Sequence, residues 1–402
     1  MLNVRKSSDD KVDTLLARGL VPIIDLAHCG TEECPVKSVV NRVGLQLQKA
    51  LSEKGMALLV NHGIADEKLK TAWDHLDDFV ELSEDVKEHY IRTPKDNHGY
   101  VSPGLERFDG KTPELRHAFN ISTLNAKNLP EEPLPGFAEH ISTLAKDFKS
   151  LASFILQSLA VSLDIPQSFF TEKHSHMLSG DHDNETTLRL LYYPPIIEDD
   201  EKNEYIRGHC KYSYQRCLSD QPDFRPEHNP RDDELNETDN TNGSDQAKST
   251  ERQLANGSVI RCGAHTDYGT FTLLAQDSEG GLEVKLPGSE KWHRVGHLPG
   301  AILVNCGEIL SIWTQERYPA LQHRVVIPEQ EHIRSRGRHS IAFFCHPDNL
   351  TMISPNDLPL PEVQDTTCKK GRKKSFKAAK DKVYNAYQLI QKRFRDTYNN
   401  SQ

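Results

Sequence analysis

A histidine and an aspartate one residue apart open an alternating, β-prone run, and this pair constrains the chain more than any other feature. The pair is His265 and Asp267, within residues 261–274. In a strand, residues i and i+2 point to the same face, so both side chains could hold one metal ion. A second histidine, His323, lies in a later β-prone run. Two imidazoles and one carboxylate form the facial triad that suits a non-haem Fe(II) centre, which keeps positions open for a substrate and O₂.

An arginine and a serine follow this triad in the next β-prone segment. Arg338 lies 15 residues after His323 in the sequence, and Ser340 is expected on the same side of the strand as Arg338. A guanidinium group binds a carboxylate through two parallel hydrogen bonds. The two residues therefore predict an anchor for an anionic co-substrate whose other end could chelate the metal.

The composition excludes several classes of function. The net charge of −10 argues against sequence-independent nucleic-acid binding, which needs a basic surface. The sequence has no apolar run of about 18 residues and no apolar signal segment at its start, so we expect neither a membrane partner nor secretion. The 8 cysteines lack the spacing of a disulfide framework, which favours reduced thiols. We expect a cytoplasmic protein, by default a monomer, with a small-molecule substrate.

The middle of the chain differs in composition from the rest. Residues 198–256 are rich in Asp, Glu, Asn, Ser and Thr and nearly free of large aliphatic side chains. Such a segment cannot bury enough apolar surface to offset its ordering entropy, so we predict a disordered insertion. Two histidines and two cysteines in it could be interpreted as a zinc cluster, but their spacing matches no familiar zinc site. These are His209, Cys210, Cys217 and His228.

The order of the remaining patterns predicts an α+β fold. In the first half, helical periodicity predicts helices at 36–54, from 66 to about 90 and at 144–163, and residues 97–110 are interpreted as a loop. Short strands about ten residues apart, separated by Gly and Pro turns, fill the second half and favour a jelly roll with flanking helices. We expect a polar N-terminal arm at 1–20, helices and strands that pack on the core at 21–130, helices with the first core strand at 131–197, the insertion at 198–256, the jelly-roll core at 257–350, and a basic stretch with a helix at 351–402.

Two further motifs have a structural interpretation that we prefer to a functional one. The basic run 369–374 could be a nuclear localisation patch, but a solvated helix start is the simpler interpretation. His62, in an Asn-His-Gly sequence, is expected to be a turn residue rather than a metal ligand, because the triad is already complete.

Taken together, these motifs resemble the 2-oxoglutarate and Fe(II)-dependent oxygenases, in their isopenicillin N synthase-like branch. The resemblance covers most of the chain outside the insertion. It rests on eight segments that occur in the order of that family, at residues 21–26, 60–64, 188–195, 263–269, 280–284, 299–308, 323–326 and 338–344.

The resemblance implies a double-stranded β-helix with Fe(II) held by His265, Asp267 and His323. It also implies that Arg338 and Ser340 bind the far carboxylate of 2-oxoglutarate, with Tyr193 as a further contact. The expected reaction consumes O₂ and 2-oxoglutarate, with ascorbate as an optional reductant, and hydroxylates or otherwise oxidises a small organic metabolite while releasing succinate and CO₂.

One residue departs from the family pattern, and three alternatives remain. Many plant members have asparagine where this chain has Leu191. The first alternative is an oxoacid-independent iron oxidase. Isopenicillin N synthase uses the Arg-x-Ser pair to bind its peptide substrate, and aminocyclopropane carboxylate oxidases use ascorbate instead of an oxoacid. A catalytically idle binding protein and a zinc hydrolase on the same ligands are the others. Substrate contacts are expected from the loop around Tyr100, the residues flanking Tyr193, Tyr268 and the C-terminal helix.

Overall fold

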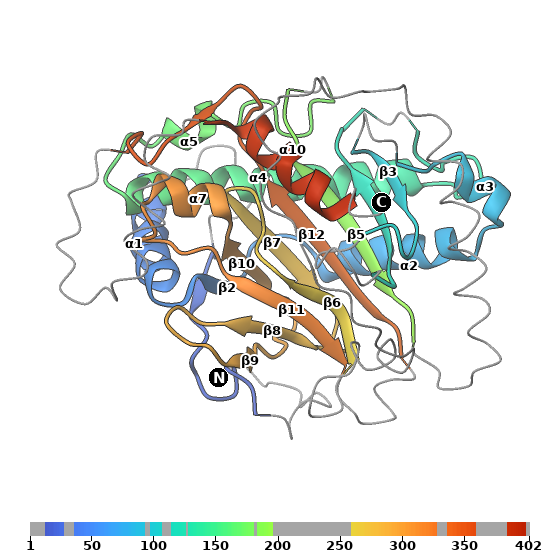
Figure 1. Cartoon of the computed structure of the whole chain (residues 1–402), viewed down its shortest axis with the longest axis horizontal. Coiled ribbons are helices and arrows are strands. Elements are labelled where there is room, and N and C mark those ends of the chain that lie inside the picture. The colour runs from blue at the N-terminus through green and yellow to red at the C-terminus, as the bar shows by residue number, and fades with distance from the viewer. Residues whose placement is uncertain are drawn as a thin grey trace, which may run out of the picture.

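The computed structural model places two β-sheets face to face and covers one of them with helices (Figure 1). This is the expected jelly roll with flanking helices. The residues that the structure describes are 13–27, 36–92, 97–106, 114–125, 128–180, 183–195, 259–327, 336–358 and 384–398. The predicted insertion, its histidines and cysteines, and the basic run 369–374 lie outside these ranges.

The larger sheet has eight strands in the order β1-β2-β10-β7-β12-β5-β4-β3. All neighbouring pairs in it are antiparallel except β1 with β2. Its strands are β1 (Ile23–Asp25), β2 (Met56–Val60), β3 (Gly99–Val101), β4 (His117–Ile121), β5 (Thr187–Tyr193), β7 (Phe271–Gln276), β10 (Ile302–Cys306) and β12 (Arg338–Cys345).

The smaller sheet has four strands in the order β6-β11-β8-β9, all antiparallel. They are β6 (Val259–His265), β11 (Gln322–Ile327), β8 (Leu282–Lys285) and β9 (Trp292–Arg294). A separate two-stranded sheet joins β13 (Met352–Ile353) to β14 (Tyr384–Asn385) near the C-terminal helix.

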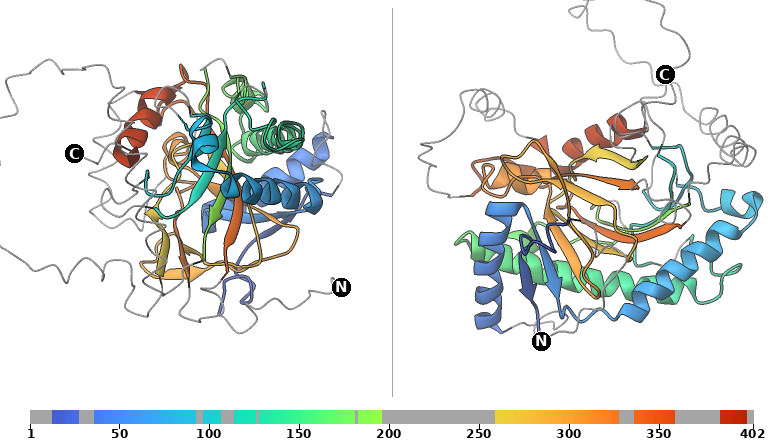
Figure 2. Two further views of the ribbon diagram at one scale, coloured as in Figure 1. Left: turned by 90° about the vertical axis from the view of Figure 1, so that its right-hand side faces the viewer. Right: turned by 90° about the horizontal axis from the view of Figure 1, so that it is seen from below.

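Helices α1, α2 and α4 form a layer on the outer face of the larger sheet (Figure 2). The long helix α4 is almost entirely apolar on its buried side, where Leu144, Phe148 and Ile155 are fully buried. The helices are α1 (Lys37–Lys54), α2 (Asp66–Glu81), α3 (Glu84–Glu88), α4 (Phe137–Ser162), α5 (Phe169–Glu172), α7 (Glu308–Trp313) and α10 (Ala386–Tyr398). Among the described residues, none of the helices has the length and apolar character to cross a membrane.

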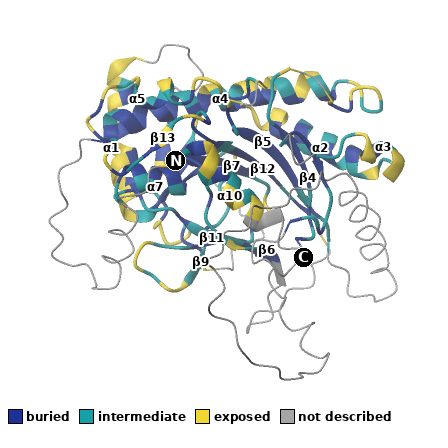
Figure 3. Cartoon of the chain, turned by 45° about the horizontal axis from the view of Figure 1, so that its top comes forward, coloured by how far each residue is buried: buried dark blue, intermediate teal, exposed yellow. Residues whose placement is uncertain are grey.

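Apart from the edge strand β1, where Ile23 and Asp25 are exposed, the strands of the larger sheet are largely buried on both faces (Figure 3), because successive side chains alternate between two cores. On β5, Leu188 and Leu190 pack toward the helices, whereas Leu191 and Tyr193 join a small cluster between the sheets. Residues of the opposite sheet, such as Cys262 and Val325, complete that cluster. The space between the two sheets is where the candidate metal ligands lie.

Most of the expected elements are present, with three differences. The helix expected from residue 66 to about 90 is divided into α2 and α3, because Leu82 and Ser83 adopt extended backbone conformations. The helix expected from residue 144 begins seven residues earlier, at Phe137. The segment interpreted as a loop from residue 97 to 110 contains the short strand β3.

Candidate metal centre and ligand cavities

His265 and His323 are brought together by the register of two neighbouring strands. They are cross-strand partners on β6 and β11, and their ring centroids lie 4.3 Å apart. One ligand atom from each of His265, Asp267 and His323 can be chosen so that all three lie within 4.8 Å of one another. The reason expected for Asp267 was wrong, since β6 ends at His265 and the aspartate follows in a loop rather than in the same strand.

Hydrogen bonds to the backbone set the orientation of both imidazole rings. Nδ1 of His265 lies 2.8 Å from the carbonyl oxygen of Gly263, and Nδ1 of His323 lies 3.1 Å from that of Leu321. A carbonyl oxygen only accepts, so each Nδ1 carries the proton and each Nε2 keeps its lone pair. These Nε2 atoms lie 3.9 and 3.7 Å from Oδ1 of Asp267. Burial lowers the pKa of both histidines, which favours the neutral, ligating form.

The Asp267 carboxylate is held by two hydrogen bonds on the side away from the histidines. Oδ2 accepts from Oγ1 of Thr272 and from Nδ2 of Asn305, each at 2.7 Å. Burial alone would raise the pKa of Asp267, but the two histidines and these hydrogen bonds lower it below its usual value. An ionised oxygen, Oδ1, therefore faces two imidazole lone pairs. This donor set fits a divalent iron ion, whose ligands are expected to be oriented by such outer contacts.

Arg338 is a buried cation whose direct partners are all neutral. Its side chain is 2 % exposed. The guanidinium donates to the carbonyl oxygen of Gly280 at 2.8 Å, to Oε1 of Gln276 at 3.0 Å and to Oγ of Ser340 at 3.2 Å. Within the described part of the chain, Arg338 forms no ion pair with a carboxylate. A buried charge whose direct hydrogen-bond partners are all neutral is costly, so the site suits an anionic ligand.

Tyr193 stands directly across from Arg338, as its cross-strand partner on β5. The centre of the guanidinium lies 5.2 Å from the centroid of the tyrosine ring. One cavity between the sheets brings all six predicted site residues together, with apolar walls from both sheets. Its polar lining includes Tyr193, His265, Asp267, His323, Arg338 and Ser340.

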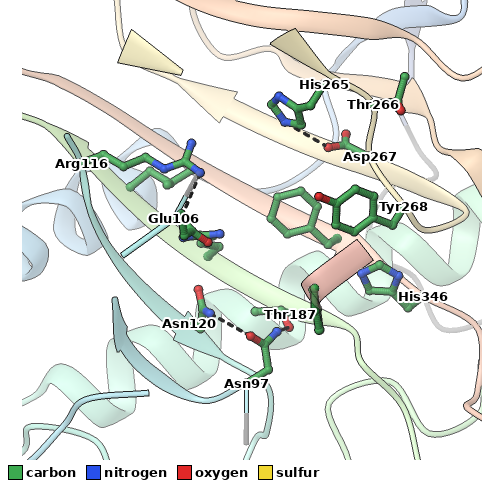
Figure 4. A pocket seen from close by; sticks show the side chains of 14 residues that line it. Asn97, Glu106, Arg116, Asn120, Thr187, His265, Thr266, Asp267, Tyr268 and His346 are labelled. Atoms are coloured by element: carbon green, nitrogen blue, oxygen red, sulfur yellow. Dashed lines mark hydrogen bonds and ion pairs between the residues drawn. The ribbon is translucent and has the colours of Figure 1, made fainter. Parts of the chain in front are cut away.

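A second cavity adjoins the metal ligands (Figure 4). The expected contributions of Tyr268 and of the C-terminal helix, through Phe394 of α10, are present. The loop around Tyr100 contributes as expected, through Asn97 and Glu106, whereas Tyr100 itself is 2 % exposed and its hydroxyl pairs with His117 in the core. Strands β4 and β5 add further polar groups. The polar lining residues are Asn97, Glu106, Arg116, Asn120, Thr187, Arg189, His265, Thr266, Asp267, Tyr268 and His346.

Arg116 lines both cavities and was not anticipated from the sequence. Its guanidinium donates to Oε2 of Glu106 at 3.0 Å, to the hydroxyl of Tyr193 at 3.3 Å and to Sγ of Cys262 at 3.0 Å. Glu106 is itself buried and also accepts from Arg189 at 2.6 Å. This cluster joins the N-terminal strands to the core strands at the boundary between the cavities. Arg116 could not be recognised from the sequence, because it lies just before a strand and belongs to no recognisable motif.

The structure also accounts for His62 and Leu191. Nε2 of His62 lies 3.1 Å from the carbonyl oxygen of Gly300, and Nδ1 accepts from the backbone N–H of Ile64, so the histidine stabilises a turn as expected. Leu191 is 5 % exposed and lines both cavities. The substitution relative to many plant relatives thus leaves an apolar wall beside the metal ligands.

Two family models match the chain, and they match it in succession. Residues 21–140 match the N-terminal region of the non-haem dioxygenases of morphine synthesis, and residues 184–347 match the 2OG-Fe(II) oxygenase superfamily. The second match contains both histidines, Asp267, Arg338 and Ser340.

Curated relatives share about a quarter of their residues with the chain. A 2-oxoglutarate-dependent dioxygenase, htyE, of Aspergillus rugulosus is 24 % identical over 76 % of this chain and 82 % of its own length. Gibberellin 20 oxidase 3 of Arabidopsis thaliana is 25 % identical over 88 % of this chain and 75 % of its own length. A 1-aminocyclopropane-1-carboxylate oxidase of Dictyostelium mucoroides is 24 % identical over 86 % and 87 %, respectively.

The fold also matches solved structures. A full-length protein of Neurospora crassa, solved in complex with alpha-KG, aligns over 93 % of this chain and 96 % of that one, with a TM-score of 0.62 and 22 % identity. Two successive family models, a shared fold and a His-Asp-His group suited to iron agree with one another. The chain belongs to the 2OG-Fe(II) oxygenase superfamily, in its isopenicillin N synthase-like branch, and is a dioxygenase that uses Fe(II), 2-oxoglutarate and O₂ to oxidise a small molecule.

Proposed function

We propose that His265, Asp267 and His323 are the iron ligands of this dioxygenase, and that Arg338, Ser340 and Tyr193 bind the far carboxylate of 2-oxoglutarate. The observation that carries the proposal is the buried Arg338 guanidinium, whose hydrogen-bond acceptors are all neutral, in the same cavity as the three ligands. Ser340 adds a hydroxyl beside it, and Tyr193 covers it with an aromatic face. A dicarboxylate with one end at the metal and the other at Arg338 satisfies both ends of this cavity.

In the reaction, the protein positions groups and excludes water. Fe(II), when bound with 2-oxoglutarate, supplies the O₂-dependent oxidation and the release of succinate and CO₂. The two histidines keep their protons on Nδ1 through the carbonyl oxygens of Gly263 and Leu321, and so present Nε2 to the metal. Apolar side chains from both sheets, including Leu274 and Val284, line the co-substrate cavity and keep it dry.

The cavity lined by Asn97, Tyr268 and Phe394 is the proposed site of the primary substrate. It adjoins His265 and Asp267, so a molecule in it lies beside the metal. Its lining of aromatic faces and a few polar side chains suits a small organic metabolite. The cysteines without disulfide spacing support a reducing, cytoplasmic location, and a monomer is the default expectation.

Anaerobic titration with Fe(II) and then 2-oxoglutarate tests the co-substrate assignment. The bidentate co-substrate gives a visible metal-to-ligand charge-transfer band, from which its Kd can be measured. We expect Arg338→Gln to weaken 2-oxoglutarate binding by about a hundredfold, because a charge-assisted bidentate contact is lost. Arg336→Gln is the matched control, since Arg336 is half-exposed and pairs with Glu279 outside the cavity.

Three results would contradict this assignment. An unchanged Kd in Arg338→Gln would place the carboxylate elsewhere. An equal loss of 2-oxoglutarate affinity in Arg336→Gln would show that the effect comes from general surface charge. Iron binding without any band would favour an oxoacid-independent oxidase.

A further inference from the structure

The proposed substrate cavity contains a buried hydrogen-bond acceptor that no described residue satisfies. Asn120, on β4, is 1 % exposed and lines the cavity. Its Nδ2 donates to Oδ1 of Asn97 at 3.2 Å, but its Oδ1 has no hydrogen-bond partner within the described part of the chain. Buried polar groups are nearly always paired, so a lone acceptor on a cavity wall marks a place where a ligand donates.

The orientation of the Asn120 amide is fixed by its neighbours. Oδ1 of Asn97 accepts from Nε of Arg92 at 2.8 Å, and an arginine nitrogen can only donate. Nδ2 of Asn97 in turn donates to Oγ1 of Thr187 at 3.0 Å. Asn97 must therefore offer its oxygen to Asn120, which turns the nitrogen of Asn120 toward it. Figure 4 shows the remaining oxygen of Asn120 directed away from Asn97.

A second buried group with an unsatisfied atom lines the same cavity. His346 follows β12 and is 4 % exposed, and its Nδ1 has no hydrogen-bond partner among the described residues. Burial lowers its pKa to about 4, so the ring is neutral near pH 7. A neutral imidazole has one N–H donor and one acceptor. Asn120 and His346 are thus two uncharged groups of the cavity lining that each have an unpartnered atom, and together they can accept one hydrogen bond and donate another.

Aromatic side chains form the rest of this wall. Phe344 of β12, Tyr268 and Phe394 line the cavity, and the Tyr268 and Phe394 rings lie 6.3 Å apart between centroids. Flat apolar faces with a few oriented polar groups are typical of sites for small, partly polar molecules.

We propose that the primary substrate is a small neutral molecule with an amide-type CO–NH group, whose N–H donates to Oδ1 of Asn120. His346 is the second polar contact, and Asn120 is the specificity-determining residue. A neutral CO–NH group has one donor and one acceptor, which matches the acceptor of Asn120 and the N–H donor of His346. The inference rests on the proposed function, because it requires the substrate to lie in the cavity beside the metal.

The test uses pairs of compounds that differ only at the N–H group. Each of 2-piperidone, glutarimide and acetanilide is compared with its N-methyl derivative. Binding is measured under nitrogen from the perturbation of the charge-transfer band of the protein loaded with Fe(II) and 2-oxoglutarate. We expect at least one N–H compound to bind about tenfold or more tightly than its N-methyl partner, because methylation leaves the buried acceptor unpaired. We expect this preference to vanish in Asn120→Leu and in the smaller variant Asn120→Ala.

If Asn120 had a purely structural role, its replacement would lower the melting temperature of the ligand-free protein. Asn120→Leu removes one hydrogen bond but also one unsatisfied acceptor, so its melting temperature should stay near that of the wild type. Asn184→Leu is the matched control, since both ends of that buried amide are paired, with His346 O, Asp348 and the Thr186 N–H. We expect the control to melt distinctly lower than Asn120→Leu.

The possible outcomes distinguish a failure of the role of Asn120 from a failure of the proposed co-substrate site. Absence of the charge-transfer band in the wild type would overturn the proposed co-substrate site. A normal band without any preference for N–H compounds, or a preference that persists in both Asn120 variants, would overturn the role of Asn120. A melting temperature of Asn120→Leu as low as that of Asn184→Leu would also overturn it.

Discussion

Asn305 donates a hydrogen bond to Asp267 at 2.7 Å, although the two residues are 38 positions apart in the sequence. Asn305 lies on β10 of the larger sheet, whereas Asp267 follows β6 of the smaller one. The bond therefore joins the two sheets at the metal centre and orients the only carboxylate among the three proposed ligands.

Loss of this bond should weaken the binding of iron without abolishing the fold. We expect Asn305→Leu to raise the Kd for Fe(II) by about 10–100-fold, the usual cost of removing an outer contact to a metal ligand. Anaerobic titration with Fe(II) measures it, and Asn125→Ala, at an exposed position, serves as the control. Unchanged affinity in Asn305→Leu would show that the Asp267 carboxylate is oriented by other contacts.

The C-terminal helix α10 is tied to the metal-binding loop through an ion pair. Arg393 donates to Oε1 of Glu308 at 2.6 Å, and the same oxygen accepts from Oγ1 of Thr266 at 2.5 Å. Because Phe394 lies next in the helix and lines the substrate cavity, this pair positions a wall of the cavity.

We expect Arg393→Gln to loosen α10 and to leave 2-oxoglutarate binding unchanged. The pair is partly exposed, so its contribution is about 1 kcal/mol or less. Hydrogen exchange of the backbone amides in 386–398 should be up to about fivefold faster than in the wild type. Arg395→Gln, at an exposed position on the same helix, is the control. Equal exchange in wild type and Arg393→Gln would contradict the anchoring role.

The raised pKa of His339 predicts that the stability of the fold depends on pH in the alkaline range. Burial alone would lower its pKa, but hydrogen bonds to Asp277 and Asp77 raise the pKa from 6.5 to about 9. A group whose pKa is raised on folding contributes stability below its unfolded pKa, and loses that contribution as the pH rises through the folded pKa. The stabilisation should be present up to about pH 6.5 and disappear near pH 9.

Melting temperatures between pH 6 and pH 10 measure this effect. We expect the wild type to lose stability across this range by more than His339→Gln does, so that the two curves converge at high pH. His89→Gln, at an exposed position on the surface, should follow the wild type. Curves for wild type and His339→Gln that stay parallel would refute the coupling of His339 to Asp77 and Asp277.

The sequence was most informative where one short segment contains both the structure and the chemistry. The spacing of His265 and Asp267 and the pair Arg338 and Ser340 could be recognised because strand periodicity orients neighbouring residues. His323 was proposed as the third ligand from its own β-prone run, and the resemblance to a family then added Tyr193. The structure brings all six into one cavity, through the register of β6 with β11 and of β5 with β12.

The sequence was least informative where contacts connect distant strands. Asn120, Arg116 and His346 share a cavity only because β4, β5 and β12 are neighbours in the sheet, and pairing over such distances has no local signal. Asp267 lies beside the two histidines, but strand alternation is not the reason. It is oriented by Thr272 and Asn305 from other strands rather than by continuation of β6.

The most direct test of the proposed metal centre is the iron content of the anaerobically reconstituted protein. We predict one Fe(II) per chain in the wild type and in the control His89→Ala, and almost none in His265→Ala, Asp267→Ala and His323→Ala. The three ligand variants should still fold, with far-UV circular dichroism like that of the wild type. Stoichiometric iron retained in all three variants would contradict the assignment of the metal centre.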